Sequence, residues 1–262
     1  MRKLTTLLVI FWFSQSLTMA SYISLKTTIE PKILDHKIKI KVSSINKGDE
    51  SAYNVQSQLR FGNKIFFAPK QMELTPNARY QAQAEFPLAL TKPGSYPLIL
   101  VMHYTDANQY PFSAPLVQTF AYRSEAISPI TGKLNPITIS KDGKLPLSLK
   151  NSSDAEVKLK LQFVLPQELS ADEKTTTLDL APKSEQILNI PIKNFSALSG
   201  SSYQVFAIVQ TEDKSWHYTN VFPTLVKIVP PQEIFGVSYQ IIFVILILLI
   251  FFLVGAQFFK RL

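Results

Sequence analysis

The chain has 262 residues, with 27 Lys or Arg against 19 Asp or Glu, a formal net charge of +8, and no Cys. This length leaves room for two ordinary domains plus targeting segments. The absence of Cys excludes disulfides and Cys-ligated metal sites, so the folded part depends on its apolar cores for stability.

Residues 1–20 have the layout of a secretory signal peptide. Arg2 and Lys3 form a basic start, and a short apolar stretch follows. Small residues come next and predict cleavage between Ala20 and Ser21. An uncleaved anchor helix is the alternative, which the shortness of the apolar stretch disfavours.

The region from residue 21 to residue 229 has the pattern of an all-β protein. Apolar residues alternate with polar ones in "HKIKIKV" (36–42) and "EVKLKLQFVL" (156–165), as in strands that are buried on one side. Turn-forming clusters such as "NKGDE", "TKPGS" and "KDGK" separate runs of this kind. Short strands with frequent turns predict sandwiches or barrels.

Two halves of this region share one register. "PGSYPLILVMHYTD" (93–106) matches "SGSSYQVFAIVQTED" (199–213), and in each the Tyr lies ten residues before the Asp. In both halves an Asn precedes a Pro by 30 or 31 residues, and that Pro precedes the Tyr by 20 or 21. A match sustained at a period of about 106 residues predicts two copies of one β-domain. We expect the Tyr and the alternate residues after it to face each core: Tyr96, Leu98, Leu100, Met102 and Tyr104, then Tyr203, Val205, Ala207, Val209 and Thr211.

The spacing of the copies suggests the domain boundaries. We expect one β-sandwich at residues 21–123 and a second at 136–229, joined by a short linker at 124–135 and stacked end to end. A stiff stalk at 230–235, with two consecutive Pro residues, then leads to the C-terminal segment.

The C-terminal segment predicts one transmembrane helix at residues 236–259. No polar side chain occurs from Ile241 to Ala256, and the segment is long enough for a hydrocarbon core of about 30 Å. Lys260 and Arg261 follow, which places residues 260–262 in the cytoplasm. The chain is thus expected to be a single-pass type I membrane protein with its bulk periplasmic or at the cell surface. A surface-sorting signal stays the alternative to a permanent anchor.

The charge outside the two end segments is mild. Four of the 27 basic residues lie in those ends, which leaves 23 against 19 acidic residues. The charges are interspersed, without a Lys/Arg run that would follow a phosphate backbone, so no nucleic-acid partner is expected. An exported chain without Cys also favours a bacterial envelope protein.

The repeated residues resemble the immunoglobulin-like modules of bacterial surface proteins known as CARDB or APHP domains. The second copy departs from the pattern, with Ser152 and Ser153 where the loop glycine belongs and Ser199 in place of Pro before its glycine. The resemblance covers roughly residues 35–225 and implies tandem Ig-like sandwiches used outside the cell for adhesion, spacing or docking. It rests on Asn46, Gly48, Leu74, Pro76, Pro93, Gly94 and Tyr96 in the first copy, and on Asn151, Leu180, Pro182, Gly200 and Tyr203 in the second.

The chain lacks the usual motifs of catalysis. It contains no GxSxG or HExxH motif and no glycine-rich phosphate loop. His36, His103 and His217 are not at metal-ligand spacing, and we expect His103 to point outward from its strand. The expectation is therefore no enzyme activity, no cofactor and no metal, with calcium sites that involve Asp49, Glu50 and Asp106 as a minor alternative.

Four aromatic residues are candidates for binding a partner. Tyr110 and Phe112 follow the hairpin turn of the first repeated strand, and Trp216 and Tyr218 follow that of the second. Exposed aromatics near such loops make binding hot spots, but packing across the hairpin is the alternative. Two glycosylation sequons, at Asn151 and Asn194, are left open.

These patterns favour a non-catalytic, membrane-anchored protein that holds an envelope protein or a surface glycan outside the cytoplasm. One alternative is an accessory subunit of a transport or export complex that contacts its partners through the transmembrane helix. Another is a carbohydrate-binding module linked to surface-glycan processing.

Overall fold

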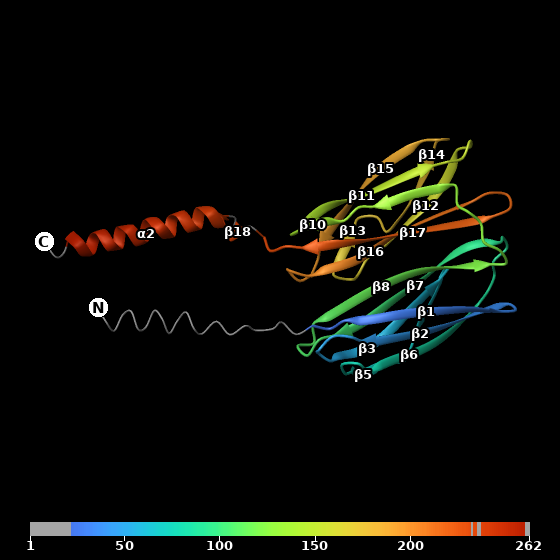
Figure 1. Ribbon diagram of the computed structural model, residues 1–262, viewed down its shortest axis with the longest axis horizontal. Helices are drawn as coiled ribbons and strands as arrows, with labels where there is room; N and C mark the ends of the chain where they lie inside the picture. The colour runs from blue at the N-terminus through green and yellow to red at the C-terminus, as the bar shows by residue number, and fades with distance from the viewer. Residues whose placement is uncertain (1–21, 232, 235–236, 260–262) are drawn as a thin grey trace. The chain divides into compact units, whose positions relative to one another are not determined.

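A computed structural model describes residues 22–231, 233–234 and 237–259 (Figure 1). Its residues are mostly in strands, with one described helix, so the all-β prediction is confirmed. The described residues fall into two compact units, which lie within the bounds Met1–Leu88 plus Met102–Phe112 and Ala89–Val101 plus Ser113–Leu262. These units do not follow the sequence repeat, because the chain passes between them inside strand β7. The domain boundaries drawn from the repeat therefore stay a prediction.

The first unit contains two facing sheets. One has the strand order β1-β2-β6, and in the other β3 pairs with β4 and β5 beside the end of β7. The hydroxyl of Tyr80, on β6, lies 3.1 Å from both the backbone N and the Oγ of Ser57 on β3, which joins the sheets through the core. The strands are β1 (Leu25–Leu34), β2 (Lys37–Asn46), β3 (Ala52–Phe61), β4 (Lys64–Phe67), β5 (Gln71–Leu74), β6 (Arg79–Pro87) and β7 (Gly94–Thr105).

The alternation along β2 explains why this strand covers a core. Ile38, Ile40 and Val42 are almost fully buried, while Lys37 and Lys41 between and beside them are exposed. Side chains on a strand alternate between the faces of the sheet, so one face packs inward and the other meets solvent. The sandwich prediction thus holds for this pair of sheets.

The second unit also has facing sheets. One has the order β13-β15-β11-β9, and the other β14-β12-β16-β17-β7, with β10 beside β17 and β8 beside β7. Its strands are β8 (Pro111–Tyr122), β9 (Ile130–Leu134), β10 (Ile137–Ile139), β11 (Asp142–Asn151), β12 (Val157–Val164), β13 (Leu169–Ala171), β14 (Thr175–Leu180), β15 (Glu185–Asn194), β16 (Ser202–Glu212), β17 (His217–Ile228), β18 (Glu233–Ile234) and β19 (Val237–Ser238).

The core of the second unit confirms the alternation expected along β16. Val205, Ala207 and Val209 are buried against Leu147 and Leu149 of the facing sheet. The residues between them are buried as well, because a second apolar cluster lies on the other side of β16 and β7. That cluster contains Ile99, Val101, Val117, Val164, Phe206 and Ile208.

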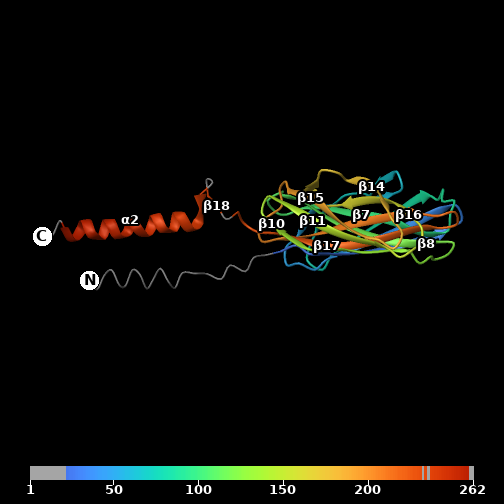
Figure 2. The ribbon, with the colours of Figure 1, turned by 90° about the horizontal axis from the view of Figure 1, so that it is seen from above.

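The helix α2 (Tyr239–Phe259) is continuous over 21 residues (Figures 1 and 2). The α2 side chains that the structure describes, between Gln240 and Phe252, are all exposed. When only described residues are considered, no helix is both long and apolar enough to cross a membrane. The predicted signal peptide, with its cleavage site at Ala20 and Ser21, lies outside the described residues.

Candidate functional site

The outer face of the β1-β2-β6 sheet carries polar side chains in rows across the three strands. Residues directly opposite each other in a sheet point to the same face, so the strand register defines the rows. Each row takes one residue from each strand. Three neighbouring rows are Lys26, Ile45 and Arg79; Thr28, Ser43 and Gln81; and Glu30, Lys41 and Gln83.

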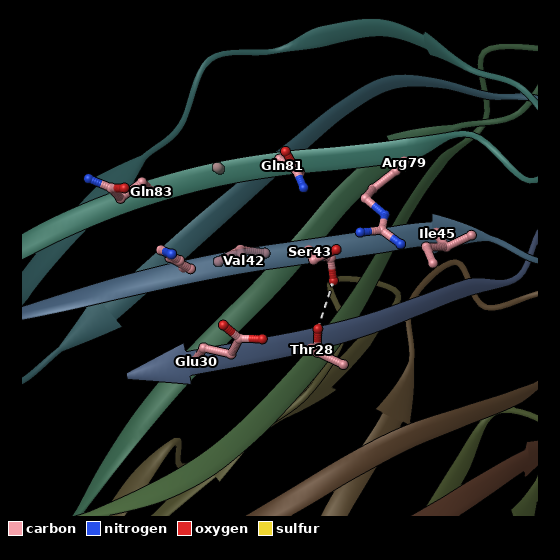
Figure 3. A pocket seen from close by; sticks show the side chains of 10 residues that line it. Thr28, Glu30, Val42, Ser43, Ile45, Arg79, Gln81 and Gln83 are labelled. Carbon is pink, nitrogen blue, oxygen red and sulfur yellow. Dashed lines mark hydrogen bonds between the residues drawn. The ribbon is translucent and has the colours of Figure 1, made fainter. Parts of the chain in front are cut away.

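These rows surround a groove of about 650 Å³ (Figure 3). Arg79 reaches from β6 over β2 toward Ser43 and Ile45, while Thr28 and Glu30 border the groove from β1 (Figure 3). The Thr28 hydroxyl donates to the backbone carbonyl of Ser43 at 3.4 Å. The groove therefore offers hydroxyl, amide and charged groups. Its two large apolar lining residues are Val42 and Ile45.

Ion pairs on this face are concentrated at one end. Lys37 Nζ lies 2.6 Å from one carboxylate oxygen of Glu85, and Lys39 Nζ lies 4.0 Å from the other. The hydrogen bond from Lys37, helped by the charges of both lysines, holds the pKa of Glu85 below its ordinary value. By contrast, Lys41 and Arg79 form no ion pair with the described residues, although Glu30 lies opposite Lys41 in its row.

The groups that line the groove are suited to hydrogen bonding and to charge pairing with a polar ligand. Glu30 is the single carboxylate among its lining residues, and no His lines it. No cluster of three or more potential metal ligands occurs among the residues that the structure describes. A second cavity, of about 500 Å³, lies at the β1–β2 turn and includes exposed His36 beside Asp35.

The structure brings Tyr110 and Phe112 together. Their ring centroids are 5.1 Å apart, and the ring of Phe112 stacks on that of Tyr104 at 5.4 Å. The backbone N–H of Tyr110 donates to the carboxylate of Asp106 at 2.8 Å, which closes the hairpin turn. The aromatic packing expected as the alternative to a binding role is thus present, and both side chains are partly buried.

Trp216 and Tyr218 lie at the C-terminal end of the corresponding turn between β16 and β17. Asp213 holds this turn through hydrogen bonds. The Asp213 carboxylate accepts the backbone N–H groups of Ser215 and Trp216, both at 2.7 Å, and the hydroxyl of Tyr218 at 2.8 Å. Partial burial alone would raise the pKa of Asp213, but these donors and the charge of Lys92 outweigh it and lower the pKa. None of the four predicted aromatic residues lines either cavity.

The repeated Asn residues prove to be structural. The Asn46 side-chain amide donates to the carbonyls of Glu50 and Leu74 at 2.7 and 3.0 Å, and its oxygen accepts the N–H of Gly48 at 3.0 Å. Asn151 repeats this arrangement in the second copy, where it bonds the carbonyls of Ala155, Leu180 and Ala181 and the N–H of Ser153. Both Asn residues are fully buried.

The tyrosines of the repeated strands also hold turns. The Tyr96 hydroxyl donates to the backbone carbonyl of Lys92 at 2.8 Å, and the Tyr203 hydroxyl accepts the N–H of Leu198 at 3.0 Å. The ring of Tyr96 stacks on the imidazole of His217 at 4.1 Å, with the planes 6° apart. These contacts account for the tyrosines without a role in binding.

Gly94 and His217 form a close backbone contact in the second unit. Gly94 has φ +134°, and a Cβ at this position would collide with the carbonyl oxygen of His217. His217 Nδ1 donates to the Ser95 carbonyl at 2.8 Å. Burial is the largest effect on the imidazole, and its pKa is lowered. His217 is therefore a packing residue, as is His103, whose Nε2 lies 2.9 Å from Gln58 Oε1.

Glu168 is an ionisable residue that the sequence did not single out. It is fully buried, and its carboxylate accepts the backbone N–H and the hydroxyl of Ser113, both at 3.0 Å. Burial raises the pKa of Glu168, although these hydrogen bonds oppose the shift. The Ser113 hydroxyl also accepts the N–H of Gln167 at 2.6 Å. The contact fastens β8 to the chain just before β13.

No known protein family model matches the chain, and no curated protein matches it. Among solved structures, native Escherichia coli alpha-2-macroglobulin is 12% identical over 79% of this chain and 17% of its own, with a TM-score of 0.31. A protein of unknown function from Porphyromonas gingivalis is 10% identical over 78% and 99%, with a TM-score of 0.32. The third cohesin ScaC of Acetivibrio cellulolyticus, in complex with the ScaB dockerin, is 8% identical over 38% and 99%, with a TM-score of 0.31. Similarity this low assigns neither family nor function.

Proposed function

We propose that the chain is a non-catalytic, membrane-anchored protein that binds a glycan outside the cytoplasm through the groove on the β1-β2-β6 sheet. The groove itself carries the proposal. Its lining is made of the hydroxyl, amide and charged side chains that hydrogen-bond to sugar hydroxyls, and they come from three adjacent strands that hold them at fixed spacings.

The sequence supports the remaining parts of this proposal. The repeat favours two Ig-like sandwiches, and the segment Ile241–Ala256 without a polar side chain favours a membrane anchor. Together with the signal-peptide pattern of residues 1–20, the anchor would hold the groove at the periplasmic or outer side of the membrane.

Glycan binding is testable with the full chain in detergent on a glycan array, followed by calorimetry. Replacing Gln81 and Gln83 with Ala removes two amide groups from the groove, and we expect binding to weaken about tenfold. The matched control replaces Gln186 and Gln204, which are exposed in the second unit, and should leave affinity unchanged. Absence of binding to any glycan would refute the proposed function.

A second candidate is an accessory role in a membrane complex through α2. It is favoured by the exposure of every α2 side chain that the structure describes, since an apolar helix surface needs lipid or another helix beside it. Replacing residues 239–259 with an unrelated apolar helix tests this role. Loss of a co-purifying membrane protein would support it, and retention would refute it.

A further inference from the structure

The outer face of the β1-β2-β6 sheet concentrates positive charge. Alternation places every second residue of these strands on this face, so the lysines of "KIKIK" gather there rather than form a run in the sequence. Two carboxylates, Glu30 and Glu85, share the face with six cations. The cations are Lys26, Lys32, Lys37, Lys39, Lys41 and Arg79.

This excess is large for the chain. Between the two end segments the sequence has 23 basic and 19 acidic residues, so the excess of four on this single face equals that of the whole region. The rest of the region is balanced by comparison. Clustered charge of one sign attracts ligands of the opposite sign.

The two unpaired cations of the groove lie in the rows on either side of its central polar row. Arg79 is opposite Ile45, four residues along β2 from Lys41, a separation of about 13 Å between backbone positions at the rise of a strand. Ser43 and Gln81 lie between them in one row. A fitting ligand has two or more anionic groups, with hydroxyl groups between them.

From this arrangement we propose that the ligand is an acidic glycan, whose carboxylate, sulfate or phosphate groups pair with Lys41 and Arg79 and whose hydroxyls bond the central row. This inference rests on the proposed function and specifies its ligand class. The rows of this face carry no aromatic side chain on which nucleic-acid bases would stack. They also lack the broad apolar surface that inserts into a lipid interface.

The test compares polygalacturonate with neutral dextran, using the full chain in detergent at two salt concentrations. We expect binding to polygalacturonate that weakens with salt, and little binding to dextran. The double variant Lys41→Gln, Arg79→Gln should lose about tenfold or more in affinity, because two charge-assisted contacts are removed. A control, Lys150→Gln with Lys227→Gln, makes the same change in net charge at exposed residues of the second unit and should lose less than about twofold. Circular dichroism verifies that both variants fold.

Each other outcome has a distinct meaning. Equal binding of dextran and polygalacturonate, unaffected by the Lys41 and Arg79 changes, overturns the acidic-glycan inference and leaves glycan binding intact. No binding to either polymer, together with an empty glycan array, overturns both. Stronger binding to single-stranded DNA or to anionic vesicles, lost in the same variant, assigns the charged face to a different macromolecule and also overturns the inference.

Discussion

Replacing Asn46 with Ala should destabilise the protein strongly, although the residue touches no ligand. The change removes two donated hydrogen bonds, of 2.7 and 3.0 Å, and one accepted bond of 3.0 Å, all in a fully buried site. At about 1 kcal/mol for each bond, the free energy of unfolding should fall by about 3 kcal/mol. The carbonyl group of Glu50, in the loop after β2, and that of Leu74, the last residue of β5, would both lose their donors.

Denaturant unfolding of the full chain in detergent, followed by circular dichroism, measures this loss. Asn46→Asp adds a sharper test, because it keeps the acceptor for Gly48 but turns an oxygen toward the two carbonyl groups. It should therefore destabilise at least as much as Ala. Asn189→Ala, on an exposed strand position, is the control and should stay within about 0.5 kcal/mol. A change in the free energy of unfolding by Asn46→Ala that is no larger than that of the control would contradict the stabilising role of these hydrogen bonds. Wild-type stability of Asn46→Asp would contradict it as well.

Three further changes probe other contacts. Gly94→Ala should destabilise the protein by more than about 2 kcal/mol, since it combines a positive φ with a collision at the His217 carbonyl. Gly200→Ala, with φ +88° but open space around the new Cβ, should cost less, and thermal unfolding compares the two variants. Glu168→Gln should reduce the pH dependence of stability, because burial raises the pKa of Glu168 in the folded state above its ordinary value of 4.5. The stability that protonated Glu168 contributes is fully present below pH 4.5, and the wild type loses it relative to the variant as pH rises through the folded-state pKa. Parallel curves of unfolding free energy against pH for the two proteins, from about pH 4 to 8, would contradict this. Tyr96→Phe should lower the free energy of unfolding by about 1 kcal/mol through the lost 2.8 Å bond to a backbone carbonyl, which denaturant titration would detect and an unchanged midpoint would refute.

The strands and their inward faces could be predicted because they depend on local alternation. Ile38, Ile40 and Val42 are buried as "KIKIKV" indicates, and Leu98, Leu100 and Met102 follow Tyr96 into a core. Tyr104 is the exception: it is only partly buried and stacks with Phe112. The burial of Ile99 and Val101 was missed, although an uninterrupted apolar run is itself typical of a strand covered on both faces.

The groove could not be predicted in the same way, because it depends on pairing between distant strands. Lys41 and Gln83 share a row only through the β2–β6 register, which depends on contacts across 42 residues of sequence. The alternating lysines of β2 were a usable signal, since they must all face one side, but their neighbours on β1 and β6 were unknown. Glu168 was missed for a similar reason: its partner, Ser113, lies 55 residues away.

Comparison of the two copies separates the residues that maintain the fold from those that can carry a function. Asn46 and Asn151 end β2 and β11 with the same hydrogen bonds, so both strands have one role in the fold. Counting back from these residues, the position of Lys41 holds Pro146, and Pro146 lies opposite Asn189 where Lys41 lies opposite Gln83. A proline offers neither charge nor a donor, so the second copy lacks a counterpart of Lys41. The corresponding face of the second copy has a smaller excess of cations, with Lys133, Lys144, Lys150 and Lys193 against Asp142 and Glu185. Because the shared residues explain stability in both copies, the larger charge excess of the first copy is better explained by binding. We therefore expect the β1-β2-β6 face, rather than the hairpin aromatics, to determine ligand specificity.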